Sequence, residues 1–169
     1  KVYLTGEAYF KVAKNTEHPF VVTAGELEVL VTGTTFGVRA YKDEKDIQTT
    51  LESGQVTVRV EGKSVKLVPN KQVLFNKLTM GMEVRDVDVD LYLAWADGRL
   101  VYDNCPLEKI LTDLGRWYNI DVFYSRDELR SYQFSLNMKK HEEFIQVLEL
   151  IGKTGEVQFE VKDNTVIVR

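Results

Sequence analysis

The sequence contains few of the residues that build most catalytic and metal sites. Its 169 residues include one cysteine, Cys105, and two histidines, His18 and His141. A single cysteine excludes an internal disulfide and a cysteine-based metal cluster. The histidines lie in different halves of the chain and lack the shared face that a two-histidine metal site needs. There is no Gly-x-Ser-x-Gly nucleophile elbow and no phosphate loop ending in Gly-Lys-Ser/Thr. We therefore expect no catalytic residue, no metal and no cofactor.

The lack of a basic stripe and of a long apolar run limits the kinds of molecule that the protein is expected to bind. The 22 basic and 26 acidic residues give a net charge of −4, whereas nucleic-acid binding calls for a basic stripe. No apolar run reaches the roughly 18 residues of a membrane span, and there is no signal peptide. The sequence begins at Lys1 without a methionine, which is typical of an excised or processed piece, so any anchor is expected upstream of it. We expect a soluble chain that binds neither nucleic acid nor a small molecule.

The N-terminal half has the period of two that is typical of half-buried strands. In one such run Ala8, Phe10 and Val12 share a face. The pattern recurs at residues 27–31, 36–40, 47–51, 56–60, 65–67, 73–75 and 84–89. Turn-forming residues, mostly glycine, separate these runs at the spacing of a β-sandwich or barrel. Residues 1–93 are therefore predicted to form an all-β subdomain, either an antiparallel sandwich or a coiled sheet.

Residues 94–169 combine strands with two amphipathic helices. Asn104 is predicted to cap the first helix and Pro106 to lie in its first turn. The second helix is expected to begin near Lys140 and to end at Gly152. Strand-like runs occupy residues 100–102, 120–124, 132–138, 157–161 and 166–168. This half is predicted to be an α+β subdomain of order β-α-β-β-α-β-β.

Two further interpretations of the residues stay open. Aromatic side chains such as Trp95 can form a platform for sugars, as in a carbohydrate-binding module, and paired carboxylates can hydrolyse glycosides. The acidic residues Asp86, Asp88 and Asp90 are predicted to share the solvated face of a strand, and the glycine-containing loop of a calcium site is missing. Alternatively, the chain is a structural envelope protein with no specific partner.

Five ordered motifs are similar to those of FecR-type anti-sigma regulators. The motifs are Gly6–Ala13, Pro19–Val22, Val31–Val38, Leu51–Val56 and Leu67–Gln72. Residues 95–122, which contain Pro106-Leu107 and Arg116-Trp117-Tyr118-Asn119, resemble the C-terminal domain found in the Bacteroidetes branch of that family. That domain resembles the secretin/TonB short N-terminal fold.

The resemblance implies the periplasmic part of a single-pass inner-membrane protein that regulates transcription. Its expected partners are the N-terminal signalling domain of a TonB-dependent outer-membrane transducer and an extracytoplasmic-function sigma factor. The sigma factor would be bound by a cytoplasmic part outside this sequence. The family has no catalytic residues to carry over, so the resemblance also predicts a protein that is not an enzyme.

A signal receiver without a cofactor must work by binding its partner differently in different states. Open sheets in small αβ units commonly pair with a partner through a strand edge. We therefore predict that an edge strand, either 120–124 or 132–138, contacts the transducer domain. The predicted contact residues are Ile120, Val122, Tyr124, Tyr132, Gln133, Phe134, Ser135 and Asn137.

Overall fold

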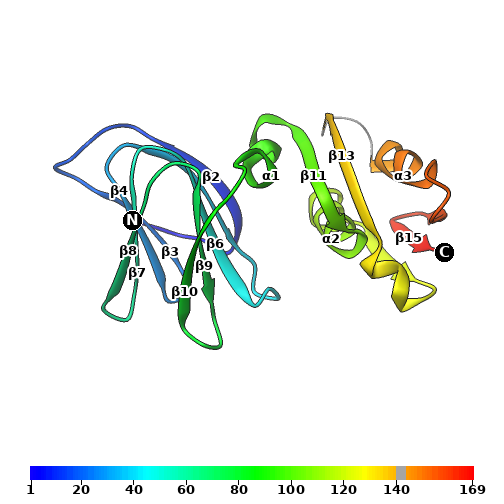
Figure 1. Cartoon of the computed structure of the whole chain (residues 1–169), viewed down its shortest axis with the longest axis horizontal. Coiled ribbons are helices and arrows are strands. Elements are labelled where there is room, and N and C mark those ends of the chain that lie inside the picture. Colours follow the sequence, from blue (N-terminus) through cyan, green and yellow to red (C-terminus); the bar gives the residue numbers. More distant parts are fainter. Residues whose placement is uncertain (140–143) are drawn as a thin grey trace. The chain divides into compact units, whose positions relative to one another are not determined.

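The computed structural model describes residues 1–139 and 144–169, which form two compact units, Lys1–Ala96 and Asp97–Arg169. Figure 1 shows the elements of both units in sequence colours. The predicted start of the second helix near Lys140, and His141, lie outside the described residues. Within the described part, the prediction of a β-rich chain with a few helices is confirmed.

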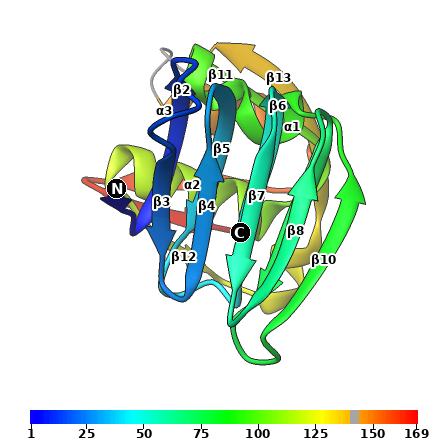
Figure 2. The same cartoon turned by 90° about the vertical axis from the view of Figure 1, so that its left-hand side faces the viewer.

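Two five-stranded sheets build the first unit. The first sheet has the order β1 (Val2–Tyr3), β3 (Phe20–Ala24), β4 (Leu27–Val31), β7 (Val56–Val60) and β8 (Lys63–Leu67). Figure 2 shows β3, β4, β7 and β8 of this sheet side by side. The second sheet has the order β10 (Gly81–Asp86), β9 (Lys71–Asn76), β6 (Asp46–Ser53), β5 (Thr34–Ala40) and β2 (Gly6–Val12). Neighbouring strands are antiparallel except β1 and β3.

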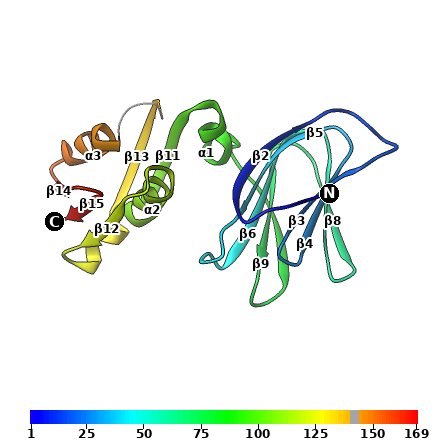
Figure 3. The same ribbon diagram turned by 180° about the vertical axis from the view of Figure 1, so that it is seen from behind.

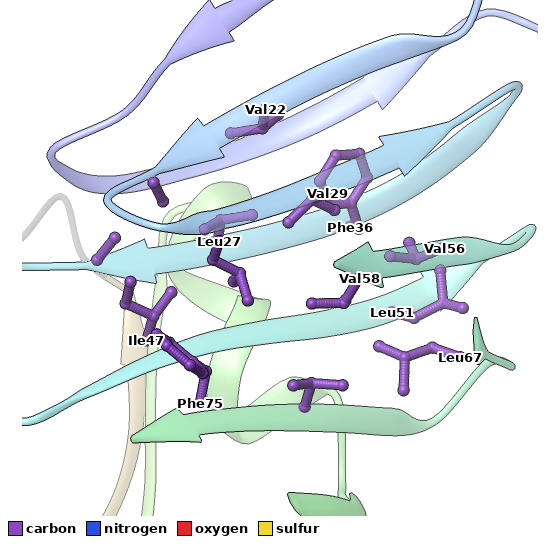
Figure 4. Packing of buried hydrophobic residues seen from close by; sticks show 14 of the residues in the cluster. Val22, Leu27, Val29, Phe36, Ile47, Leu51, Val56, Val58, Leu67 and Phe75 are labelled. Atoms are coloured by element: carbon purple, nitrogen blue, oxygen red, sulfur yellow. The ribbon is translucent and has the colours of Figure 1, made fainter. Parts of the chain in front are cut away.

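The alternating apolar residues of both sheets meet in one core. Val29 and Val58 of the first sheet belong to the same core cluster as Phe36, Leu51 and Phe75 of the second, and Figure 4 shows Val29 beside Phe36. These side chains are 0 to 1% exposed. In strands such as β4 and β7, the period of two thus reports a division into a buried face and a more exposed face.

A short helical segment follows the last strand of this unit. The strand predicted over residues 84–89 ends at Asp86, and α1 (Asp90–Leu93) and η1 (Ala94–Asp97) follow. Asp86, Asp88 and Asp90 therefore do not share a strand face, which corrects the prediction. In the part of the chain that the structure describes, no group of three His, Cys, Asp or Glu side chains is arranged to hold a metal ion.

The described residues of the second unit form two smaller sheets and two α-helices, which can be followed from behind in Figure 3. Its elements in chain order are β11 (Arg99–Pro106), α2 (Leu107–Tyr118), β12 (Asp121–Tyr124), η2 (Asp127–Ser131), β13 (Gln133–Lys139), α3 (Phe144–Gly152), β14 (Phe159–Lys162) and β15 (Thr165–Val168). Strand β11 pairs with β13 in antiparallel orientation, whereas β12 runs parallel to β15, which also pairs with β14. The strands on either side of α2 therefore belong to different sheets.

Helix α2 buries its apolar stripe in the core of this unit. Leu107, Ile110, Leu111 and Leu114 are 0% exposed, as their helical spacing predicts. The predicted cap is wrong: Pro106 occupies the N-cap position without a side-chain cap, and Asn104 lies in β11. No described helix has both the length and the apolar composition that a membrane crossing requires.

Replacing each of two adjacent threonines of β6 by valine should change stability in opposite directions. Thr49 Oγ1 is buried without a hydrogen-bond partner among the described residues, whereas Thr50 Oγ1 accepts a hydrogen bond from Gln72 Nε2 at 2.7 Å. Thr49→Val removes an unsatisfied hydroxyl and should raise the free energy of unfolding by about 1 kcal/mol. Thr50→Val deprives the Gln72 amide of this partner and should lower it by about 1 to 2 kcal/mol. Urea unfolding of both variants measures the difference, and a change of the same sign in both would contradict the prediction.

Candidate protein-interaction edges

Two strands of the second unit, β12 and β13, lie at the edge of a sheet. In the two-stranded sheet, β13 pairs with β11 and with no other described strand. In the three-stranded sheet, β12 occupies an outer position beside β15. An edge strand carries a row of backbone N–H and C=O groups that a partner strand can pair with. The predicted contact segments 120–124 and 132–138 thus coincide with these two edges.

The hydrogen bond at the start of β13 determines which backbone groups face the open edge. The Leu107 N–H donates to the Tyr132 carbonyl at 2.7 Å. Because backbone groups alternate in direction along a strand, those of Phe134 also point toward β11, whereas those of Gln133 and Asn137 point toward the open edge. The side chains follow the same alternation, since Phe134 is 7% exposed and the other two are exposed.

Ser135 has a structural role within the sheet. The register between β11 and β13 shifts between Tyr102 and Cys105, so that Asp103 and Asn104 together lie opposite Ser135. The Asn104 N–H donates to Ser135 Oγ at 2.8 Å, and Ser135 Oγ donates to Asp103 Oδ1 at 3.0 Å. The φ of Asn104 is +43°, a conformation that asparagine adopts more readily than most residues. Ser135 therefore holds a β-bulge together, which sequence reasoning missed.

The open edge of β12 is shorter. The Asp121 N–H donates to the Asn164 carbonyl at 2.8 Å and the Ser125 N–H donates to the Val168 carbonyl at 2.9 Å. The residues that bond to β15 are therefore 121, 123 and 125, and the backbone groups of Val122 and Tyr124 face the open edge. Because β12 spans four residues and β13 seven, β13 offers the longer surface for strand pairing.

Most apolar residues of the predicted contact set contribute side chains to the core. Ile120 and Phe134 are both 7% exposed and belong to the apolar cluster, and Val122, Tyr124 and Tyr132 pack against it partly buried. Phe123, which was not predicted as a contact, is 61% exposed on the outer face of β12. The edges thus present backbone groups and polar side chains rather than aromatic anchors.

A charged group beside Tyr124 was also missed by sequence reasoning. The Arg130 guanidinium lies 4.2 Å from the centre of the Tyr124 ring. Arg130 donates to Glu108 Oε1 at 2.9 Å and to Asp127 Oδ1 at 3.1 Å. The only signal in the sequence is the charged loop 126–130, and the partner Glu108 lies 22 residues away along the chain.

Burial raises the pKa of the Tyr124 phenol from its usual value of 10.0 to about 12, and the neighbouring Arg130 opposes this shift. The neutral phenol is thus favoured in the folded state. Its contribution to stability should be fully present below pH 10 and be lost as the pH rises toward about 12. In an ultraviolet titration of tyrosinate, we expect a late step that Tyr124→Phe removes. A Tyr124→Phe curve that keeps its late step unchanged would contradict this assignment.

The remaining candidate side chains have ordinary surroundings. His18 lies exposed in a turn, where its backbone N–H donates to Asn15 Oδ1 at 3.0 Å. Cys105 is half-buried in β11 with its Sγ 3.8 Å from the Pro106 carbonyl. Trp95 Nε1 donates to the Tyr92 carbonyl at 2.8 Å. None of these contacts resembles a nucleophile activated by a neighbouring base.

Comparison with solved structures shows the fold. Two crystal structures of a candidate anti-sigma factor from Parabacteroides distasonis ATCC 8503, at 1.65 and 2.50 Å resolution, have TM-scores of 0.84 and 0.83 to this chain. In both, the similarity covers 99% of this chain and 79% of the other at 22% sequence identity. None of the curated proteins matches the sequence.

Family comparison matches both units. The family described as FecR protein matches residues 2–57, within the β-sandwich, and the family described as FecR, C-terminal matches residues 99–168, from β11 to β15. The motifs that suggested the resemblance lie mostly within these two stretches. The chain therefore belongs to the FecR-type anti-sigma factors, a regulatory rather than an enzymatic family, and carries both the FecR region and its C-terminal region.

Proposed function

We propose that this chain is the periplasmic signal-receiving region of a transmembrane anti-sigma regulator. In this proposal it couples a TonB-dependent outer-membrane transducer to an extracytoplasmic-function sigma factor, which a cytoplasmic part of the same regulator holds. Residues 94–169 bind the N-terminal signalling domain of the transducer. Residues 1–93 form the FecR-like domain, which connects them to the membrane-anchored part of the regulator.

The observation that carries the proposal is the open edge of β13. A strand of the transducer domain would pair with the backbone groups of Gln133 and Asn137 and extend the β11–β13 sheet. The exposed polar side chains of these residues lie on the outer face, so an added strand would not have to displace the core. The bulge at Ser135 fixes the register of the sheet and would thereby fix the register of the incoming strand.

The sugar-binding alternative has less support. An aromatic platform needs exposed parallel rings, but Trp117 packs partly buried against the core and Trp95 bonds to the Tyr92 carbonyl. Titration with soluble glycans should therefore give no heat and no spectral shift. A structural envelope protein, by contrast, predicts that no transducer domain binds the chain at all.

The binding test uses purified chain and the isolated N-terminal signalling domains of transducers from the same organism. Asn137→Pro removes one N–H from the open edge without breaking a bond to β11, because proline is tolerated at edges. We expect it to weaken binding by at least about tenfold, the equivalent of one or two lost backbone hydrogen bonds. Asn137→Ala keeps the N–H and is the matched control, for which we expect little change.

A Val122→Pro variant tests the competing edge of β12. If it abolishes binding while Asn137→Pro does not, the partner uses β12. Far-ultraviolet circular dichroism checks that each variant is folded. Unchanged affinity in both proline variants would overturn strand pairing as the mode of recognition.

A further inference from the structure

Residues 87–96, which we call the strap, cross the outer face of the second sheet in the first unit. The backbone N–H of Val87 donates to the Asn70 carbonyl at 3.0 Å, where the strap begins. Leu93 of α1 is 6% exposed. A Cβ added at Gly37 of β5 would lie 2.3 Å from Leu93 Cδ2. The missing side chain at Gly37 therefore forms a notch that Leu93 fills.

Polar contacts also join the strap to the sheet. Arg85 Nη2 donates to the Tyr92 hydroxyl at 3.2 Å, and Arg85 Nε donates to Gln72 Oε1 at 2.9 Å. Gln72 in turn donates to Thr50 Oγ1 at 2.7 Å. Gln72 is 0% exposed although it lies on the face of β9 opposite the apolar core. A connected row of polar groups thus leads from the strap into the sheet.

This composition makes the strap easier to detach than the central strands β6 and β9. Polar groups that open to water exchange one hydrogen bond for another, whereas apolar groups lose their burial. The buried apolar residues of the strap that detachment would expose are Leu93 and Ala94. Elements with few buried apolar contacts open locally, below the threshold of global unfolding. The strap is also the covalent connection to the second unit, which begins at Asp97.

We infer that the strap is a releasable latch: Leu93 leaves the Gly37 notch and Tyr92 leaves Arg85 while both sheets stay intact. Release transmits the state of the second unit to β5, β6 and β9 of the first. The opening itself follows from the contacts of the strap. Its part in signalling rests on the proposed function.

Hydrogen exchange of the full chain tests the opening. The amides of Leu91, Tyr92 and Leu93 are hydrogen-bonded within the strap, so their exchange reports its release. We expect them to exchange faster than the amides of β6 and β9, and Leu93→Ala to accelerate them by at least about tenfold without affecting those strands. Leu78→Ala, at a leucine that is 87% exposed, is the matched control. Strap amides that exchange only together with β6 and β9 would overturn the latch.

A double-mutant cycle tests the notch. Gly37→Ala should expel Leu93 and accelerate strap exchange, because its new Cβ would clash with Leu93 Cδ2 at 2.3 Å. In the Leu93→Ala background, the same change should have almost no effect, since the clashing atom is gone. Equal effects of Gly37→Ala in both backgrounds would overturn the assignment of the notch.

A reporter assay with the full regulator tests transmission. Leu93→Ala should change sigma-dependent transcription severalfold while leaving the affinity for the transducer domain unchanged. A strap that opens locally but leaves the reporter unaltered would overturn its part in signalling. If the unmodified chain bound no transducer domain, the proposed function would fail instead, and hydrogen exchange would still decide whether the strap opens.

Discussion

Gly54→Ala should lower the free energy of unfolding of the first unit by about 3 kcal/mol. The φ of Gly54 is +89°, and a Cβ there would lie 2.6 Å from the Gly33 carbonyl oxygen. The first factor strains the backbone of any residue with a side chain, and the second requires backbone to move in a packed region. The backbone strain and the steric conflict occur at the same residue, because the turn after β6 crosses the turn before β5.

The crossing is further closed by a hydrogen bond. Thr34 Oγ1 donates to the Gln55 carbonyl at 2.7 Å, so each turn holds the other. Two of the ordered motifs, Val31–Val38 and Leu51–Val56, therefore meet at one place in the structure. The contact between these two turns, rather than a ligand site, explains why the two motifs occur together.

Gly62→Ala is the matched control for this prediction. Gly62 also has a positive φ, +77°, but a Cβ there would meet nothing within 4 Å. Its substitution should cost only the backbone strain, about 1 kcal/mol. Urea unfolding of both variants separates strain from steric conflict, and equal losses of stability would show that the two turns are not tightly packed.

The elements that could be predicted from sequence are those whose own residues decide their burial. Strands such as β4 and β7 have one buried face, so their apolar residues alternate. Helix α2 buries one stripe, so Leu107 and Leu114 lie on the same side of it. In each case the local period is a direct consequence of where the core lies.

The features that could not be predicted depend on residues far apart in the chain. Strand β10 ends at Asp86, which pairs with the first residue of β9, and Leu93 then fills a notch at Gly37. No local pattern announces either contact. Asn104 was predicted to cap a helix. Because asparagine also tolerates a positive φ, it is equally suited to the bulge opposite Ser135, where the structure places it. A single sequence does not distinguish these two uses of an asparagine, because the partner lies 31 residues away.

The candidate site was predictable to the same limited extent. The alternation of polar and apolar residues predicted β12 and β13 as half-exposed strands. Their positions at sheet edges agree with this prediction. It did not indicate that Ile120 is a core residue or that Ser135 is used by the bulge. Pairing decides which backbone groups remain open, and pairing is set by contacts between distant segments.

Phe36→Ala should lower the free energy of unfolding by about 4 kcal/mol, the largest effect that we expect from a single change. Phe36 is 0% exposed, and its ring stacks on that of Phe10 with centroids 5.1 Å apart. Removing it opens a cavity between the two sheets, where neighbours from both sheets are fixed by their own strands and can relax only partly.

Phe123→Ala provides the matched control, since this phenylalanine is 61% exposed in the second unit. Its loss should change stability by less than about 0.5 kcal/mol. Thermal and urea unfolding of both variants, followed by circular dichroism, measure the two effects. If Phe36→Ala lowered the free energy of unfolding as little as Phe123→Ala, the two sheets would not share a close-packed core. The explanation given for the alternating pattern of the sequence would then be wrong.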